Sequence, residues 1–326
     1  MRFSRQDDSL LRQVIEILPL NEEHKPEAVL TRLEQLQRGL EPENEFAMIL
    51  SWLGRCRLVH KLGQEQLPLG STDAYRVPDL LAVFENAGRV IPVLIEVKTT
   101  DVSDPNTLNL GALSINRKYL PYAELLNLPI LVAWRHRGFW ALFEMRHASL
   151  SQMNYSIDFS TAMQENLLGV LAGDFSYRLV PGTRLKMRIR KLTEPDPETG
   201  GFDGEIQDVH FVNSIGKSIP NIPHLSSLFM FWDNETELVE DGNDIVQSFV
   251  VSDTRVVEFA SRTLRQIVRA FAAIHKSRVS WRSIAHDVKH LGHDSGRLRA
   301  LVEEGSKHGV ISNIWNFRPR TAPSFL

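Results

Sequence analysis

The stretch VPDLLAVFENAGRVIPVLIEVKT, from Val77 to Thr99, decides the fold of the N-terminal half of this chain. Apolar residues dominate positions 77–84 and again 90–97, and the Asn-Ala-Gly sequence at 86–88 has the residues of a tight turn. Two apolar strands joined by such a turn predict a β-hairpin.

Helical and strand patterns continue on both sides of the hairpin. The helix before it ends near Gly54 or continues to Gly63. After it come a helix near residues 118–126 and two strands, at 129–134 and 139–143. The order helix, strand, strand, helix, strand, strand predicts an α/β domain whose sheet is covered by helices.

The residues that carry chemistry lie at one end of this hairpin: Pro78-Asp79 opens its first strand and Glu96-Val97-Lys98 ends its second. Side chains two positions apart in a strand project from one face, so Glu96 and Lys98 point together while Val97 turns into the core. Antiparallel pairing of the strands brings Asp79 beside Glu96. Because two close carboxylates repel unless a proton or cation joins them, the pair predicts a Mg²⁺ site, with the Val97 carbonyl as a further ligand.

A site of this kind predicts hydrolysis of a phosphodiester. Bound Mg²⁺ polarises a phosphate oxygen and lowers the pKa of bound water, and we expect Mn²⁺ to substitute for it. Lys98 orients that water and offsets the developing negative charge. Alternatively, Glu96 and Lys98 line a solvated strand face and Asp79 lies in a turn. The strongly apolar strand argues against this, because inward-facing charges need a partner.

The set Pro78, Asp79, Glu96 and Lys98 in this hairpin resembles the PD-(D/E)XK nuclease superfamily, over residues 40–145. The succession of an acidic helix, the Pro-Asp strand, the Glu-Val-Lys strand and a following helix looks most like archaeal Holliday-junction resolvases and some restriction-type nucleases. The resemblance implies a restriction-endonuclease-like fold, with a mixed β-sheet flanked by helices, and cleavage of nucleic acid, usually DNA.

The resemblance also implies two further site residues. An extra acid from the preceding helix corresponds to Glu45, with Glu43 or Glu41 as alternatives. The helix after the motif often directs a polar or basic residue toward the phosphate, and Lys118 is the preferred candidate. A solvated helix face is the alternative interpretation of Lys118. The other polar residues of this helix are Asn116, Arg117, Tyr119 and Tyr122.

The C-terminal part of the chain carries an excess of positive charge. Residues 255–326 hold 13 Lys and Arg against 5 Asp and Glu, near +8, so residues 1–254 carry −11 of the total of −3. A long amphipathic helix over residues 254–276, followed by helix, turn, helix and a short apolar strand pair, predicts a helical, winged-helix-like domain. A solvated basic face without a ligand is the alternative. The candidate nucleic-acid contacts are Arg262, Arg265, Arg269, Arg297 and Arg299.

These patterns divide the chain into four segments. Residues 1–40 form an N-terminal helical segment, residues 41–150 the nuclease-like domain, residues 151–253 a β-rich middle region, and residues 254–326 the basic domain. A length of 326 residues agrees with more than one domain. We assign no chemistry to the middle region.

Composition indicates a cytoplasmic protein. Hydrophobic residues make up 43% and charged residues 24% of the chain, as in ordinary globular proteins. The N-terminus lacks the apolar stretch of a signal peptide, and no run of about 18 apolar residues occurs, so we expect no contact with a membrane. The single cysteine, Cys56, falls in a stretch with a helical pattern and is expected in the core.

Three functions are open from the sequence. The first is a DNA endonuclease in restriction-type antiviral defence or in repair and recombination, expected as a homodimer because cutting both strands of a duplex commonly needs two active sites. The second is a DNA-binding regulator with a catalytically silent nuclease-like scaffold, against which the complete set of Asp79, Glu96 and Lys98 argues. The third is an RNA nuclease, or an effector nuclease activated by a ligand bound within residues 150–250.

Overall fold

The structure is a computed structural model of the chain. It describes residues 42–63, 66, 71–100, 106–151, 153–194, 202–219, 225–226, 235–251, 257–274 and 296–326. The helices expected within residues 1–40 lie outside the described residues.

A five-stranded sheet forms the centre of the N-terminal half, in the order β1-β2-β3-β5-β6. Neighbouring strands are antiparallel except β3 and β5, which are parallel. The expected mixed sheet is therefore confirmed. Its strands are β1 (Cys56–Lys61), β2 (Leu80–Asn86), β3 (Arg89–Thr99), β5 (Ile130–His136) and β6 (Phe139–Glu144).

The predicted hairpin is formed by β2 and β3. Asn86 pairs with Arg89, so the loop consists of Ala87 and Gly88. Both loop residues have positive φ, 50° and 77°, as a type I′ turn requires. This turn twists in the sense of the paired strands, which explains how so short a segment sets their register.

A helix over residues 42–53 packs on one face of this sheet. Its Phe46 is fully buried, and the ring centre lies 4.6 Å from that of Trp140. The helix ends at Gly54, whose φ of +102° suits glycine, so it does not continue toward residue 63. Cys56 consequently lies in strand β1 rather than in a helix, and its side chain is only partly exposed.

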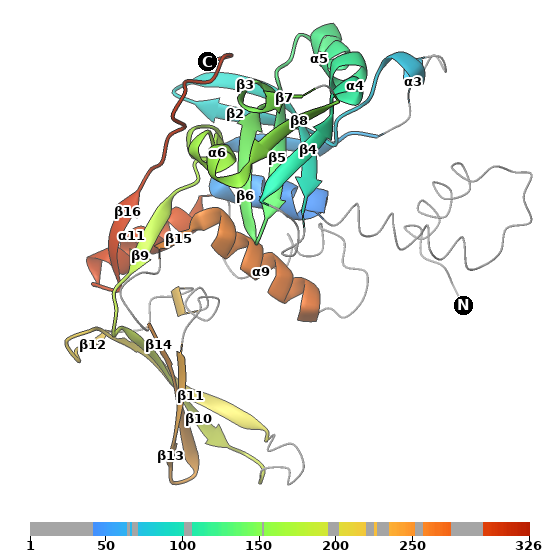
Figure 1. Cartoon of the computed structure of the whole chain (residues 1–326). Coiled ribbons are helices and arrows are strands. Elements are labelled where there is room, and N and C mark those ends of the chain that lie inside the picture. Colours follow the sequence, from blue (N-terminus) through green and yellow to red (C-terminus); the bar gives the residue numbers. More distant parts are fainter. Residues whose placement is uncertain are drawn as a thin grey trace, which may run out of the picture.

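Short helices and a three-stranded sheet pack on the other face, where Ile115 and Tyr119 join Val132 and Trp134 in a second core. The sheet has the order β4-β8-β7. Figure 1 shows these elements beside the central sheet. They are α3 (Ser71–Ala74), α4 (Ala112–Ser114), the π-helix η1 (Ile115–Tyr119), α5 (Leu120–Leu126), β4 (Thr107–Gly111), β7 (Ser149–Leu150) and β8 (Asn154–Asp158).

The chain between residues 145 and 175 stays with this α/β body. The expected boundary between residues 150 and 151 falls between β7 and β8, which pair with each other. The C-terminal tail also returns here, since the Thr321 amide donates to Glu165 at 2.9 Å and the Ser324 amide to Glu144 at 3.2 Å. The connecting helices are the 3-10 helix η2 (Met145–His147), α6 (Phe159–Gln164) and α7 (Leu168–Leu171).

A second five-stranded sheet, fully antiparallel, extends away from the α/β body (Figure 1). All of its strands lie within residues 184–250, in the part of the chain that was expected to be rich in strands. Its order is β12-β11-β10-β14-β13. The strands are β10 (Arg184–Lys191), β11 (Gly204–Val212), β12 (Ser218–Ile219), β13 (Glu235–Asp241) and β14 (Asp244–Val250).

In its described residues, the C-terminal segment contributes two helices and two strands. The strand pair predicted from Gly309 to Phe317 is one strand, β16, which pairs with β9 in a sheet of order β15-β9-β16. Residues 275–295, which hold the turn of the expected helix-turn-helix, lie outside the described residues. No helix in the described ranges is long and apolar enough to span a membrane. The elements are β9 (Ser176–Leu179), β15 (Val257–Phe259), α9 (Ala260–Ile274), α11 (Arg297–Lys307) and β16 (Ile311–Trp315).

A buried carboxyl, Asp174 of the loop between α7 and β9, contacts the first turn of α9. Its Oδ1 accepts the Ser261 amide at 3.0 Å and the Phe175 amide at 2.9 Å. Its buried Oδ2 has no hydrogen-bond partner in the described part of the chain. Burial raises the pKa of Asp174 from 3.8 to about 6, because the charged form loses its hydration.

Stability is therefore expected to depend on the ionisation of Asp174. The pKa of Asp174 is higher in the folded chain than in the unfolded chain. Its contribution to the stability of the fold is therefore complete at a pH below the unfolded-state pKa, and it is lost as the pH rises through about 6. Asp174→Asn, which keeps an oxygen acceptor, should raise the free energy of unfolding at pH 7 by on the order of 1–3 kcal/mol. Urea unfolding at pH 5 and pH 7 measures this.

The control for this prediction is Asp158→Asn. Hydrogen bonds from Thr161 lower the pKa of exposed Asp158, so its removal should destabilise the protein at pH 7, the opposite sign. A loss of stability in Asp174→Asn at pH 7 would contradict the prediction.

Candidate active site

Asp79 and Glu96 lie side by side at the open end of the hairpin. Leu80 pairs with Ile95, which sets Asp79 opposite Glu96 on the same face of the sheet. Asp79 Oδ2 accepts the Val97 amide at 2.7 Å. The Val97 side chain is buried in the main core, as expected from the alternation of the strand.

Glu96 is nearly fully buried, with 2% of its surface exposed. Its Oε1 accepts hydrogen bonds from the Lys98 ammonium and from the Tyr119 hydroxyl, the latter at 2.6 Å. Its Oε2 is buried without a partner among the described residues. Burial raises the pKa of Glu96, the charge of Lys98 lowers it, and the charge of Asp79 raises it. The sequence-predicted trio of Asp79, Glu96 and Lys98 is thus brought together.

Glu43, at the start of the helix over residues 42–53, is the third acid of the cluster. Burial raises the pKa of Asp79, the Val97 amide lowers it, and the charge of Glu43 raises it again. On its other side, Glu43 Oε2 lies 2.9 Å from the Lys61 ammonium of β1. The helix therefore does contribute an acid next to the hairpin.

Glu45, the residue expected to supply that acid, points elsewhere. It is 5% exposed and accepts hydrogen bonds from Arg135 at 2.9 Å, Arg265 at 2.9 Å and the Trp140 indole at 3.1 Å. Positions two apart in a helix do not face the same way. The structure therefore corrects the choice of Glu45 in favour of Glu43, which was one of the two alternatives.

The helix after the motif presents Tyr119, rather than Lys118, to the cluster. The Lys118 ammonium donates to the Thr72 carbonyl at 3.3 Å, so its role toward a phosphate stays a prediction. Tyr119 ends the π-helix η1, and such segments occur often at functional sites. The Arg76 guanidinium lies 5.3 Å from the centre of the Tyr119 ring, which adds a cation that sequence patterns did not single out.

Two of the arginines on α9 are engaged in pairs. Arg265 is bound to buried Glu45, so it does not belong to a solvent-facing basic stripe, which corrects that expectation. Arg262 is bound to buried Glu258 at 2.9 Å. Arg269 is exposed, and its contact with nucleic acid stays a prediction.

Of the two arginines on α11, one is likewise paired and the other is exposed. Arg299 donates to Glu303 at 2.7 Å and to Asn316 at 2.8 Å, and its guanidinium lies 4.8 Å from the centre of the Phe175 ring. Arg297, at the start of the helix, is exposed. The described structure therefore leaves Arg297 and Arg269 as the arginines of the expected set with solvent-facing side chains.

The carboxylates at this site fit a hard divalent cation that takes only some of its ligands from the protein. Asp79 and Glu96 are adjacent, and Glu96 Oε2 is a buried anion oxygen without a hydrogen-bond donor from the described residues. Within the described ranges, no three His, Cys, Asp or Glu side chains form a group suited to hold a metal by themselves. Mg²⁺ is usually bound by one or two carboxylates, with water and substrate phosphates completing its shell. The pair agrees with that pattern.

Removal of the Tyr119 hydroxyl should weaken metal binding at this site without unfolding the protein. Tyr119→Phe keeps the buried ring but frees Glu96 Oε1 from one donor, so Oε2 loses its orientation. Supporting contacts of this kind contribute about 10–100-fold to metal affinity, and Mn²⁺ titration by calorimetry should show such a loss. Tyr155→Phe is the matched control, because the Tyr155 hydroxyl donates to Asn116 at 2.8 Å on the surface. Equal affinities in the two variants would contradict this role of Tyr119.

Comparison with solved structures finds the Holliday junction resolvase Hjc of Archaeoglobus fulgidus, an archaeal hyperthermophile. The two chains are 19% identical, with a TM-score of 0.30, over 38% of this chain and 92% of the resolvase. No protein-family model matches the chain, and no curated protein matches it.

Proposed function

We propose that this chain is a Mg²⁺-dependent endonuclease that hydrolyses phosphodiester bonds of DNA. The observation that carries the proposal is the convergence of Asp79, Glu96 and Lys98 on paired strands, with one buried oxygen of Glu96 left without a donor in the described structure. Three charged groups at one end of two paired, largely buried strands need a compensating ligand. A divalent cation supplies that compensation.

Each side chain has a separate task in this proposal. Asp79 and Glu96, with the Val97 carbonyl, hold the cation, and Tyr119 fixes the carboxylate of Glu96. When bound, Mg²⁺ or Mn²⁺ polarises a phosphate oxygen and activates a water molecule. Lys98 orients that water and offsets charge that develops on the phosphate.

Glu43 and Lys61 lie at the edge of the same cluster and adjust its charge. The Lys61 ammonium neutralises Glu43, which otherwise repels Asp79. Arg76 is exposed beside Tyr119 and is positioned to meet a phosphate of the nucleic-acid backbone. DNA is the proposed substrate, in restriction-type defence or in repair and recombination, and a homodimer supplies the two sites that cleavage of both strands requires.

The test incubates the full chain with supercoiled plasmid, linear duplex, single strands, branched DNA and RNA, each with Mg²⁺, Mn²⁺ or EDTA. Lys98→Ala is compared with Lys307→Ala, which removes an exposed lysine of α11 that pairs with Glu304. We expect metal-dependent cleavage that Lys98→Ala abolishes and Lys307→Ala retains. The preferred substrate then distinguishes restriction, junction resolution and RNA decay. Wild-type protein that is inert on every substrate with both metals would overturn the proposal.

A further inference from the structure

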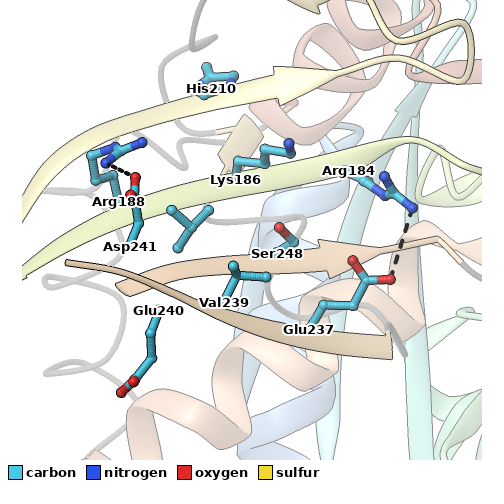
Figure 2. Close-up of a pocket in the computed structure, with 10 residues that line it drawn as sticks. Arg184, Lys186, Arg188, His210, Glu237, Val239, Glu240, Asp241 and Ser248 are labelled. Atoms are coloured by element: carbon cyan, nitrogen blue, oxygen red, sulfur yellow. Dashed lines mark hydrogen bonds and ion pairs between the residues drawn. The ribbon is translucent and has the colours of Figure 1, made fainter. Parts of the chain in front are cut away.

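A groove crosses the sheet of β10–β14 and uses none of the residues of the candidate active site (Figure 2). Its volume is about 420 Å³, within the range of about 300–1,000 Å³ typical of small-ligand pockets. Arg184, Lys186 and Arg188 alternate along β10, so their side chains share the face that lines the groove. Lys186 pairs in register with His210 on β11 and Ser248 on β14.

The positive charges of the row formed by Arg184, Lys186 and Arg188 are neutralised unevenly by nearby carboxylates. Arg188 lies 2.8 Å from Asp241 and 3.2 Å from Asp244, so two carboxylates pair with its guanidinium. Arg184 meets Glu237 at 3.9 Å, the outer limit of an ion pair. Figure 2 shows the Lys186 side chain between these two arginines. The excess positive charge therefore lies at the Arg184 end of the row.

Two donors at that end lack acceptors. The Nε of Arg184 is buried and has no hydrogen-bond partner in the described structure. The Lys186 side chain is partly buried and forms no hydrogen bond or ion pair with the described residues. A buried donor without an acceptor destabilises the folded chain. Two cations with unused donors at neighbouring positions on one strand face match the acceptor oxygens of an anion.

We infer that this groove binds the phosphate of a nucleotide, free or within a nucleic-acid strand, through Arg184 and Lys186. A phosphate presents several charged oxygens, enough for a guanidinium and an ammonium at once. The opposite wall holds Glu237 and Asp241 on β13. These carboxylates accept hydrogen bonds from sugar hydroxyls or base amino groups, which inorganic phosphate lacks. The inference does not rest on the proposed nuclease activity.

The test measures binding to the full chain in EDTA, so that no metal-dependent reaction alters the ligand. Calorimetry follows titration with ATP, a short single-stranded DNA oligonucleotide and inorganic phosphate. Arg184→Gln and Lys186→Gln are compared with Arg190→Gln. Arg190 lies on the same strand and face, outside the groove lining, and is 52% exposed. The variants thus remove the same charge from the same strand at different places.

We expect saturable binding that Arg184→Gln and Lys186→Gln each weaken about tenfold or more, the effect of one charge-assisted hydrogen bond. Arg190→Gln should change the affinity less than about twofold, as an exposed charge does. Binding of ATP assigns the groove to a free nucleotide, and binding of the oligonucleotide alone assigns it to a strand. Absence of binding, equal losses in all three variants, or inorganic phosphate binding as tightly as ATP would overturn the inference.

Discussion

Glu96→Gln is expected to reduce Mg²⁺-dependent cleavage by about a thousandfold or more, because it removes a charge that holds the cation and an oxygen that the cation needs. Glutamine has the size of glutamate and keeps an acceptor for Tyr119 and Lys98, so the fold should persist. Because Glu96 Oε2 is buried without a donor in the described structure, the variant should unfold in EDTA at no lower temperature than the wild type.

The matched control is Glu85→Gln, which changes an exposed carboxylate of the same hairpin. Glu85 pairs with Arg57 on the surface, with 39% of its side chain exposed, and its loss should leave cleavage unchanged. Turnover and thermal unfolding, each with and without Mg²⁺, measure both variants. Cleavage by Glu96→Gln at a rate near that of Glu85→Gln would remove Glu96 from the metal site.

Glu45→Ala should produce the largest loss of stability, about 3 kcal/mol or more. Glu45 accepts from Arg135 of β5, Arg265 of α9 and Trp140 of β6. Burial lowers the pKa of Arg265, and the charge of Glu45 raises it. Without Glu45, two arginines that are mostly buried lose their shared counter-charge, and α9 loses a contact with the α/β body.

Urea unfolding measures this effect, with Glu303→Ala as the control. Glu303 pairs with Arg299 on the surface of α11 and is 51% exposed, so its removal should cost less than about 1 kcal/mol. The opposite result is also informative. Unchanged stability in Glu45→Ala, together with complete loss of cleavage, would return Glu45 to the catalytic role suggested by the family resemblance.

The hairpin and the pairing of Asp79 with Glu96 could be predicted because they depend on local rules. Alternation sets which side chains share a strand face, and the turn at residues 86–88 sets the register across two adjacent strands. The helix over residues 42–53 is local in the same sense, since Phe46, Ile49, Leu50 and Leu53 recur at helical spacing. Its end at Gly54 could not be chosen from the sequence, since Cys56 and its neighbours satisfy both a helical and a strand pattern.

Residues that meet across long sequence separations could not be predicted. The choice between Glu43 and Glu45 depends on how the helix is rotated against the sheet, and the presentation of Tyr119 depends on a π-helical segment that no spacing rule indicates. Arg265 has the helical spacing of a basic face. Its partner, however, is 220 positions away.

The α/β architecture, the hairpin and the meeting of Asp79, Glu96 and Lys98 could be predicted from the chain alone, because each follows from backbone periodicity over a few residues. The folded chain was needed to show that Glu43 lies beside Asp79, that Arg265 is a buried counter-charge, and that β16 pairs with β9. Those outcomes depend on which distant surfaces pack together, and burial of charge and sheet pairing between remote segments leave no periodic trace in the chain.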